Sequence, residues 1–246
     1  MELPKILVKG KFTPKDLDVS VGISNRKIDQ MIERELDVLW DETVVKANQD
    51  GRICYNGISY RLNSVVENER KLIIDFGTIE YKVRHGLVNI CEYSDLSEEF
   101  FCKSCSCSAT IRTSNEEYVM VELSGRSMNT NSIDLVGGIM ETDLEIHTGD
   151  DVFSSFYKEL KEEAGVVEND IDEVYLRTIF LEHSTNVCFY FEVTLIINSE
   201  ELLLRFKNNS DIDIKSIQTF NKREYQEVLN NHKSKNKRLI AEHLMI

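Results

Sequence analysis

The chain has 246 residues, of which 41% are hydrophobic and 29% are charged, and its formal net charge is −14. This length and apolar content allow a sizeable buried core, and the two prolines argue against a long flexible linker. The acidic balance, with only scattered Lys and Arg, argues against nucleic acid as a partner. No apolar run approaches 18 residues, and residues 1–10 lack the apolar stretch of a signal peptide. We therefore expect a soluble, cytoplasmic protein that has no membrane partner.

The first half of the chain predicts one long helix among several strands. Apolar residues at helical spacing predict the helix over residues 24–46, with Ser24 as its cap. The strand-like runs are residues 5–8, 57–63, 71–76, 78–81, 109–113 and 117–123, with Gly77 as a bend between the third and the fourth. Residues 84–107 form a looser segment with an acidic patch. Together these elements predict an α+β arrangement.

The second half continues the mixture of strands and helices. It predicts a helix that begins near Asp150 or Asp151 and ends at Gly165, because these residues are good helix caps. The later strands are predicted over residues 174–182, 187–197 and 214–220, and the later helices over residues 199–206, 223–229 and 234–243. We expect a mixed sheet that is flanked by helices.

The segment 137–166 carries the most specific pattern in the chain, because a Gly-Gly turn precedes a helix with two distinct stripes. Three carboxylates fall at i, i+3 and i+4 on one stripe, namely Glu159, Glu162 and Glu163. An apolar stripe can anchor the same helix in a core, and it contains Phe153, Phe156, Leu160 and Ala164. Such a helix either turns its glutamates to water or presents oxygen ligands to a hard divalent cation held against a phosphate.

The end of this segment resembles the signature of the nudix hydrolases. Residues 158–166, KELKEEAGV, match the end of the nudix box, with Lys158 in place of the family's Arg. Gly138 lies twenty residues before Lys158, which is six more than the family pattern has. Asp150 stands at the spacing of the first box Glu. The resemblance implies that an Asp150–Lys158 pair braces the loop against the helix, more weakly than the family's Glu–Arg pair because Lys lacks a bidentate fork.

A narrower resemblance is to the animal nudix enzymes that hydrolyse UDP-glucose and UDP-galactose. Their box also has an insertion, followed by a run similar to residues 152–155, VFSS. Further similar stretches occur in the same order at residues 39–62, 72–86 and 119–138. The resemblance implies an alpha/beta/alpha sandwich with a mixed sheet over residues 108–246. Residues 1–107 would then form an N-terminal α+β extension packed on that domain.

The resemblance also implies a reaction and its residues. The reaction would be hydrolysis of the pyrophosphate of a UDP-sugar to UMP and a sugar 1-phosphate, with Mg²⁺ or Mn²⁺ as cofactor. The metal ligands would be Glu159, Glu162, Glu163 and the Gly137 carbonyl, and Glu162 or Glu163 would accept the proton of the attacking water. Further acidic ligands could come from Glu192, Glu182 or Asp143. The substrate would contact Tyr81, Lys82 and Arg126, and His183 and Asn186 would border its pocket.

Two other functions remain compatible with this pattern. One is a nudix hydrolase that acts on another nucleoside diphosphate derivative, such as ADP-ribose, a dinucleotide or coenzyme A, because the box determines the chemistry and leaves the base unread. The other is a nucleotide-binding module of nudix fold without turnover. Lys158 and the irregular loop are the features that suggest it.

The six cysteines are too few and too unevenly placed for a disulfide framework, so we expect reduced thiols. Cys102, Cys105 and Cys107 are close enough in sequence to share a zinc ion, but no fourth ligand is evident. The alternative, which we favour, is that they are small residues in a loop before the strand at residues 108–112.

Overall fold

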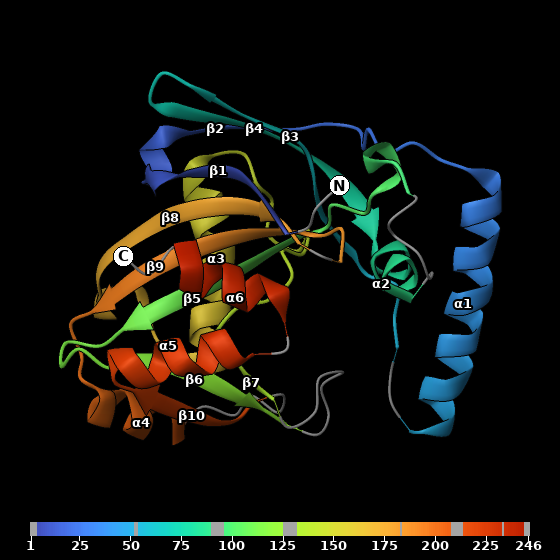
Figure 1. The fold of residues 1–246 in the computed structure, drawn as a ribbon. Helices are drawn as coiled ribbons and strands as arrows, with labels where there is room; N and C mark the ends of the chain where they lie inside the picture. The colour runs from blue at the N-terminus through green and yellow to red at the C-terminus, as the bar shows by residue number, and fades with distance from the viewer. Residues whose placement is uncertain are drawn as a thin grey trace.

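The computed structural model describes residues 4–51, 54–89, 96–124, 132–182, 184–207, 214–232 and 234–243. Within these residues the strands form a seven-stranded sheet and a three-stranded sheet (Figure 1). The large sheet has the order β1-β8-β9-β5-β6-β10, with β7 paired to β6. Its strands are β1 (Lys5–Phe12), β5 (Cys105–Arg112), β6 (Tyr118–Leu123), β7 (Ile133–Asp134), β8 (Ile171–Leu181), β9 (Val187–Leu195) and β10 (Ile214–Phe220). The sheet is mixed, as predicted, because β5 and β9 run parallel while β8 and β9 run antiparallel.

Helices cover both faces of the large sheet. In Figure 1, α3 (Gly149–Ala164) lies behind the sheet, and α5 (Lys222–Asn231) and α6 (Lys235–His243) lie in front of it. Phe156 of α3 stacks on Phe191 of β9 with ring centroids 4.3 Å apart. On the other face, Tyr225 and Leu229 of α5 and Ile240 of α6 share a buried cluster with residues of the sheet. The expected mixed α/β class, with helices on both sides of a sheet, is confirmed.

The three-stranded sheet shares the main core. It has the order β2-β4-β3, from β2 (Leu17–Val21), β3 (Ile58–Asn68) and β4 (Lys71–Glu80). Phe76 of β4 stacks on Phe189 of β9 with centroids 5.7 Å apart, and both side chains are fully buried. The predicted division after residue 107 falls inside β5, and β1 belongs to the large sheet. The N-terminal segment is therefore interleaved with the rest of the chain through one sheet and one core.

The two N-terminal helices differ from the prediction at their boundaries. The long helix α1 (Gln30–Gln49) begins six residues after the predicted Ser24, because Asp29 accepts hydrogen bonds from the Met31 and Ile32 amides. A second helix, α2 (Tyr81–Asn89), begins where a strand was predicted to end and occupies part of the segment expected to be loose. The remaining described elements are α4 (Ser199–Lys207) and the short 3-10 helices Pro14–Asp16, Glu98–Phe100 and Glu168–Asp170.

Gly77 has a different role from the predicted bend, since β4 runs through it without interruption. A Cβ atom at this position would lie 2.7 Å from the Ser24 Cα. The glycine therefore permits the segment before α1 to pass close over the strand. None of the helices in the described ranges combines the length and the apolar character needed to cross a bilayer.

Candidate functional site

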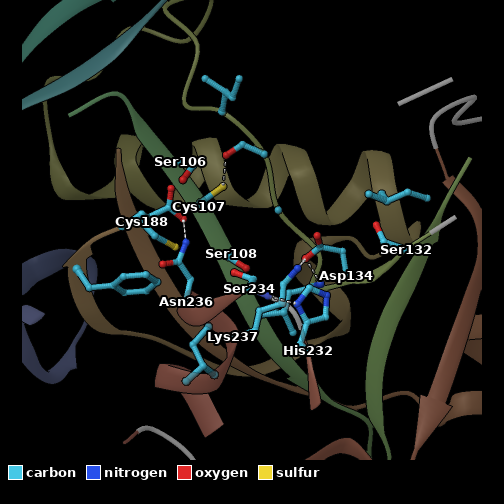
Figure 2. Close-up of a pocket in the computed structure, with 18 of the residues that line it drawn as sticks. Ser106, Cys107, Ser108, Ser132, Asp134, Cys188, His232, Ser234, Asn236 and Lys237 are labelled. Carbon is cyan, nitrogen blue, oxygen red and sulfur yellow. Dashed lines mark hydrogen bonds and ion pairs between the residues drawn. The ribbon is translucent and has the colours of Figure 1, made fainter. Parts of the chain in front are cut away.

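A cavity of about 780 Å³ opens between the Gly-Gly turn, β5 and the C-terminal helices. Residues from eight parts of the chain line it, and Figure 2 shows most of them. The lining side chains that carry polar or charged groups include Arg84, Ser106, Ser108, Ser132, Asp134, Glu163, Glu182, His232, Ser234, Asn236 and Lys237. In the close-up, Asp134, His232 and Ser234 lie together on one side, while Asn236 and Cys188 lie on the other. The cavity is within the size range of small-molecule sites.

The Gly-Gly turn is held against β5 by backbone hydrogen bonds. The Cys107 amide donates to the Gly138 carbonyl over 2.9 Å, and the Ala109 amide donates to the Val136 carbonyl over 3.0 Å. Gly137 has a φ of +152°, and a Cβ atom there would lie 2.1 Å from the Cys107 carbonyl oxygen. A side chain at Gly137 would therefore collide with the strand, so the close approach of the turn to β5 requires glycine.

Two carboxylates of α3 converge on this turn. Glu163 Oε2 accepts a hydrogen bond of 2.8 Å from the Gly137 amide. The Glu159 carboxylate lies against Gly138, where a Cβ atom would be 2.3 Å from Glu159 Oε2. Burial, and then the charges of Glu159 and Glu163, raise the pKa of the Cys107 thiol, so both carboxylates act on one point beneath the turn. Residues 137 and 163, which are far apart in sequence, thus meet at the turn.

The local sequence explains how α3 presents these groups. The Asp151 carboxylate accepts hydrogen bonds from the His147 and Thr148 amides and from the Thr148 hydroxyl, at 2.8–2.9 Å. Thr148 is therefore the N-cap, in place of the predicted Asp150 or Asp151, and Asp151 is the reciprocal acid of a capping box. At the other end, Gly165 takes the left-handed conformation with φ of 69°, as predicted.

The predicted third carboxylate, Glu162, is exposed on α3 and is not one of the residues that line the cavity. Its charge contributes to raising the pKa of Lys158, after the larger effect of Asp143. Among the described residues, no group of three or more His, Cys, Asp or Glu side chains is arranged to hold a metal ion. Of the three predicted carboxylates, Glu159 and Glu163 are therefore the two that contact the Gly-Gly turn.

The expected brace between Asp150 and Lys158 is replaced by another pair. Lys158 Nζ lies 2.6 Å from Asp143 Oδ2 and 3.8 Å from Glu141 Oε2. Asp143 lies in the loop between the Gly-Gly turn and α3, and its carboxylate is within reach of the Lys158 ammonium. This pair still ties the loop to α3, and the hydrogen bond to Lys158 lowers the pKa of Asp143.

The residues predicted to contact the substrate lie in different places. Tyr81, at the start of α2, packs against Trp40 and His85 with ring centroids 6.1 Å from each. Lys82 forms ion pairs with Asp37 at 2.9 Å and Glu80 at 3.4 Å. Neither residue lines the cavity. Arg126 and His183 lie outside the described residues.

Arg84 reaches the cavity instead, from the same helix. Its Nη1 donates to the Ser104 hydroxyl over 3.1 Å, and the Ser104 hydroxyl is itself 3.0 Å from that of Ser59. The sequence carried one signal for Arg84, since it lies three residues after Tyr81 and so shares a face with it on a helix. Sequence analysis did not identify Arg84, because it predicted a strand and a loose segment here where the structure has a helix.

The C-terminal helix also contributes residues that the motif did not indicate. Lys237 contacts the Asp134 carboxylate, and the Asn236 amide donates to Glu182 Oε1 over 3.1 Å. Glu182 was one of three candidates for a further acidic ligand. Glu192 pairs with Arg177 at 3.2 Å, and Asp143 pairs with Lys158. Helical periodicity predicted α6 but could not indicate which element it would cover.

Three of the cysteines lie in the interior of the protein. Cys102, Cys105 and Cys107 are free, buried thiols, and the last two belong to β5 instead of the loop expected before it. Burial raises the pKa of all three thiols. All three side chains lie in the buried core, and for Cys105 and Cys107 this place in β5 corrects the loop that the sequence predicted.

No protein-family model matches this chain, and no curated protein matches it in sequence. Solved structures do show a weak likeness. A NUDIX hydrolase from Nitrosomonas europaea is 16% identical, with 55% of this chain and 83% of that chain covered and a TM-score of 0.37. The NUDIX domain of Shewanella oneidensis NrtR, complexed with ADP ribose, is 11% identical, with coverages of 57% and 84% and a TM-score of 0.37. The MutT protein of Methanosarcina mazei Go1 is 18% identical, with coverages of 53% and 83% and a TM-score of 0.31. TM-scores this low do not establish a family.

Proposed function

We propose that this protein hydrolyses the pyrophosphate bond of a UDP-sugar, such as UDP-glucose or UDP-galactose, to UMP and a sugar 1-phosphate with the help of Mg²⁺ or Mn²⁺. The observation that carries the proposal is the convergence of Glu159 and Glu163 on the Gly137–Gly138 turn. The nudix-like end of α3 implied this meeting of helix and turn. Glu163 also lines the cavity, so the paired carboxylates border a space in which a substrate fits.

The donors at the turn suit a magnesium ion. Mg²⁺ takes hard oxygen ligands, and in proteins it is usually held by one or two carboxylates together with waters and substrate phosphates. Glu159 and Glu163 would supply the two carboxylates, with Glu162 and the Gly137 carbonyl as the further ligands that the resemblance implies. When bound, the ion would neutralise diphosphate charge and polarise the attacking water.

The protein's own groups have complementary roles. The Gly137 amide holds one oxygen of Glu163 and so fixes the direction of its carboxylate. We assign the other oxygen to accept the proton of the attacking water. Arg84, anchored by the Ser104 hydroxyl, brings a guanidinium to the cavity. In a chain with a net charge of −14, such a local cation is needed to bind an anionic diphosphate.

The choice of a UDP-sugar rests on the resemblance of residues 39–62, 72–86 and 119–138 to the UDP-glucose and UDP-galactose enzymes. Hydroxyl, amide and carboxylate groups on the cavity wall agree with a polyhydroxylated substrate. The alternative is another nucleoside diphosphate derivative, because the carboxylates act on the diphosphate and leave the rest of the substrate to the remaining cavity.

A substrate panel tests this function. Purified protein is incubated with Mg²⁺ and, separately, with UDP-glucose, UDP-galactose, ADP-ribose and a dinucleoside diphosphate, and the phosphorylated products are separated by chromatography. We expect UMP and sugar 1-phosphate from the UDP-sugars at the highest kcat/KM. Preference for a substrate without uridine would contradict the UDP-sugar assignment, and nucleotide binding without any turnover would favour a binding module.

A further inference from the structure

Helix α6 contributes two neighbouring residues to the cavity, and each contacts a carboxylate from a different strand region. Lys237 contacts Asp134 of β7, and Asn236 donates to Glu182 at the end of β8. Lys237 is 11% exposed and Asp134 is 26% exposed, so this ion pair is largely withdrawn from bulk water. Beside α6, the cavity wall thus presents the carboxylates of Asp134 and Glu182, and each of them lies next to a hydrogen-bond donor of the helix.

The part of the cavity beside α6 and the part beside Arg84 differ in their balance of charged groups. The cavity's described lining carries three carboxylates, of Asp134, Glu163 and Glu182, against the two cations Arg84 and Lys237. Burial, followed by the charge of Lys237, lowers the pKa of His232, so this imidazole is neutral at pH 7 and adds no positive charge. Lys237 is already neutralised by Asp134. A second phosphate is therefore disfavoured at the α6 wall, whereas a neutral ligand is not.

Hydroxyl groups suit this wall better than a flat aromatic base does. A sugar hydroxyl can donate to a carboxylate while it accepts from an adjacent ammonium or amide, so each of the two pairs can bind neighbouring hydroxyls. Ser108 and Ser132 add further hydroxyls to the described lining. The aromatic rings in that lining are Phe180, which is 1% exposed, and His232. Phe180 is therefore too buried to offer a stacking face to a base, and the half-buried His232 is the remaining ring of this lining.

We propose that the wall formed by Asp134, Glu182, Asn236 and Lys237 binds the sugar of the nucleotide sugar and selects it through its hydroxyl groups. This inference rests on the proposed function, because it takes the diphosphate to lie between Arg84 and Glu163. It assigns sugar recognition to the C-terminal helix, outside the segment 137–166. The uridine then lies away from α6.

The test compares UDP-glucose with UDP, which has the same nucleotide and no sugar. Affinities are measured by isothermal titration calorimetry with Mg²⁺ in a Glu163→Gln background, in which hydrolysis is slowed. We expect Lys237→Met to weaken UDP-glucose binding by about tenfold or more, since a hydrogen bond from a charged group is lost, and to leave UDP binding within about twofold. Lys222→Met is the matched control, because Lys222 is exposed on the neighbouring helix α5. It should change neither affinity.

Removing Lys237 alone leaves Asp134 without its cation, so the double variant Asp134→Asn/Lys237→Met is measured as well, and thermal unfolding reports whether both proteins fold. Equal weakening of UDP and UDP-glucose would overturn the proposal, since the nucleotide would then occupy this wall. Unchanged binding of both would overturn it too. If the wild-type protein hydrolyses UDP-glucose and the variants do not discriminate, only this inference fails. If the unsubstituted chain neither binds nor hydrolyses UDP-glucose, the proposed function fails with it.

Discussion

Gly137 and Gly138 are adjacent, but a methyl group at each would meet different atoms. At Gly137 it would meet the Cys107 backbone carbonyl at 2.1 Å, in a φ region that favours glycine. At Gly138 it would meet the end of the flexible Glu159 side chain at 2.3 Å, which can move aside. A substitution at Gly137 should therefore destabilise the fold, whereas one at Gly138 should disturb the site.

We predict that Gly137→Ala lowers the free energy of unfolding by about 1–3 kcal/mol, because backbone strain cannot be relieved locally. Gly138→Ala should leave the unfolding free energy nearly unchanged, and should lower kcat/KM about tenfold or more by displacing the Glu159 carboxylate. Urea titration and steady-state kinetics measure the two effects. Wild-type activity in Gly138→Ala would show that the position of Glu159 does not matter.

Residue-level prediction succeeded where a single helix determines the geometry. The period of α3 places Glu159 and Glu163 one turn apart whatever surrounds the helix, and Gly165 ends it at the expected residue. Arg84 and Lys237 could not be found in this way, because their approach to the cavity depends on how α2 and α6 pack on distant strands. Arg126 stays a prediction.

The start of α3 is an element-scale feature with a pH dependence. Hydrogen bonds from the His147 backbone and then from Thr148 lower the pKa of Asp151 below its ordinary value of 3.8. A carboxylate whose pKa is lower in the folded state stabilises the fold at neutral pH, and it loses this contribution as the pH falls through that lowered pKa. The capping box of α3 should therefore weaken only in acid.

We predict that Asp151→Ala lowers the free energy of unfolding by about 1 kcal/mol at neutral pH, as loss of a cap does. The difference from the wild-type protein should shrink as the pH falls below 3.8. Asp150→Ala is the matched control, because Asp150 is an exposed neighbour that takes no part in the capping box. This variant should lower the free energy of unfolding by less. Urea unfolding over a pH series measures both variants. A pH-independent effect of Asp151→Ala would argue against the charged capping role.

Element boundaries were predicted well where a clear periodic run determines them and poorly where tertiary contacts do. The strand β9 and the helix α4 lie close to their predicted ranges, because each is a clear periodic run. In contrast, the parallel strand β2 lies in a polar stretch that the pattern did not mark as a strand. It pairs with β4, whose partner residues come more than fifty positions later.

At the scale of the whole molecule, the two sheets share one core through Phe76 and Phe189. The resemblance implied a boundary after residue 107, and no sequence pattern reveals that β1 pairs with β8 across it. The structure thus predicts that residues 4–107 do not unfold separately from the rest of the described chain.

We predict that Phe76→Ala lowers the free energy of unfolding by about 3–5 kcal/mol, the usual cost of removing a buried ring. Ile73→Ala, on the same strand with a 43% exposed side chain, is the matched control and should cost far less. Unfolding followed by both circular dichroism and Trp40 fluorescence should give one cooperative transition. Two separate transitions would show that the N-terminal segment folds on its own.

The most direct test of the central claim is the rate of UDP-glucose hydrolysis, with Mg²⁺, by the Glu163→Gln protein. Glu163 meets the Gly-Gly turn and borders the cavity, so neutralising it should lower kcat/KM by about a hundredfold or more, a loss of several kcal/mol of transition-state stabilisation. Glu173→Gln, an exposed carboxylate on β8, should leave the rate unchanged. A Glu163→Gln protein that keeps its rate within about tenfold of the wild-type protein would contradict the assignment of this carboxylate to catalysis.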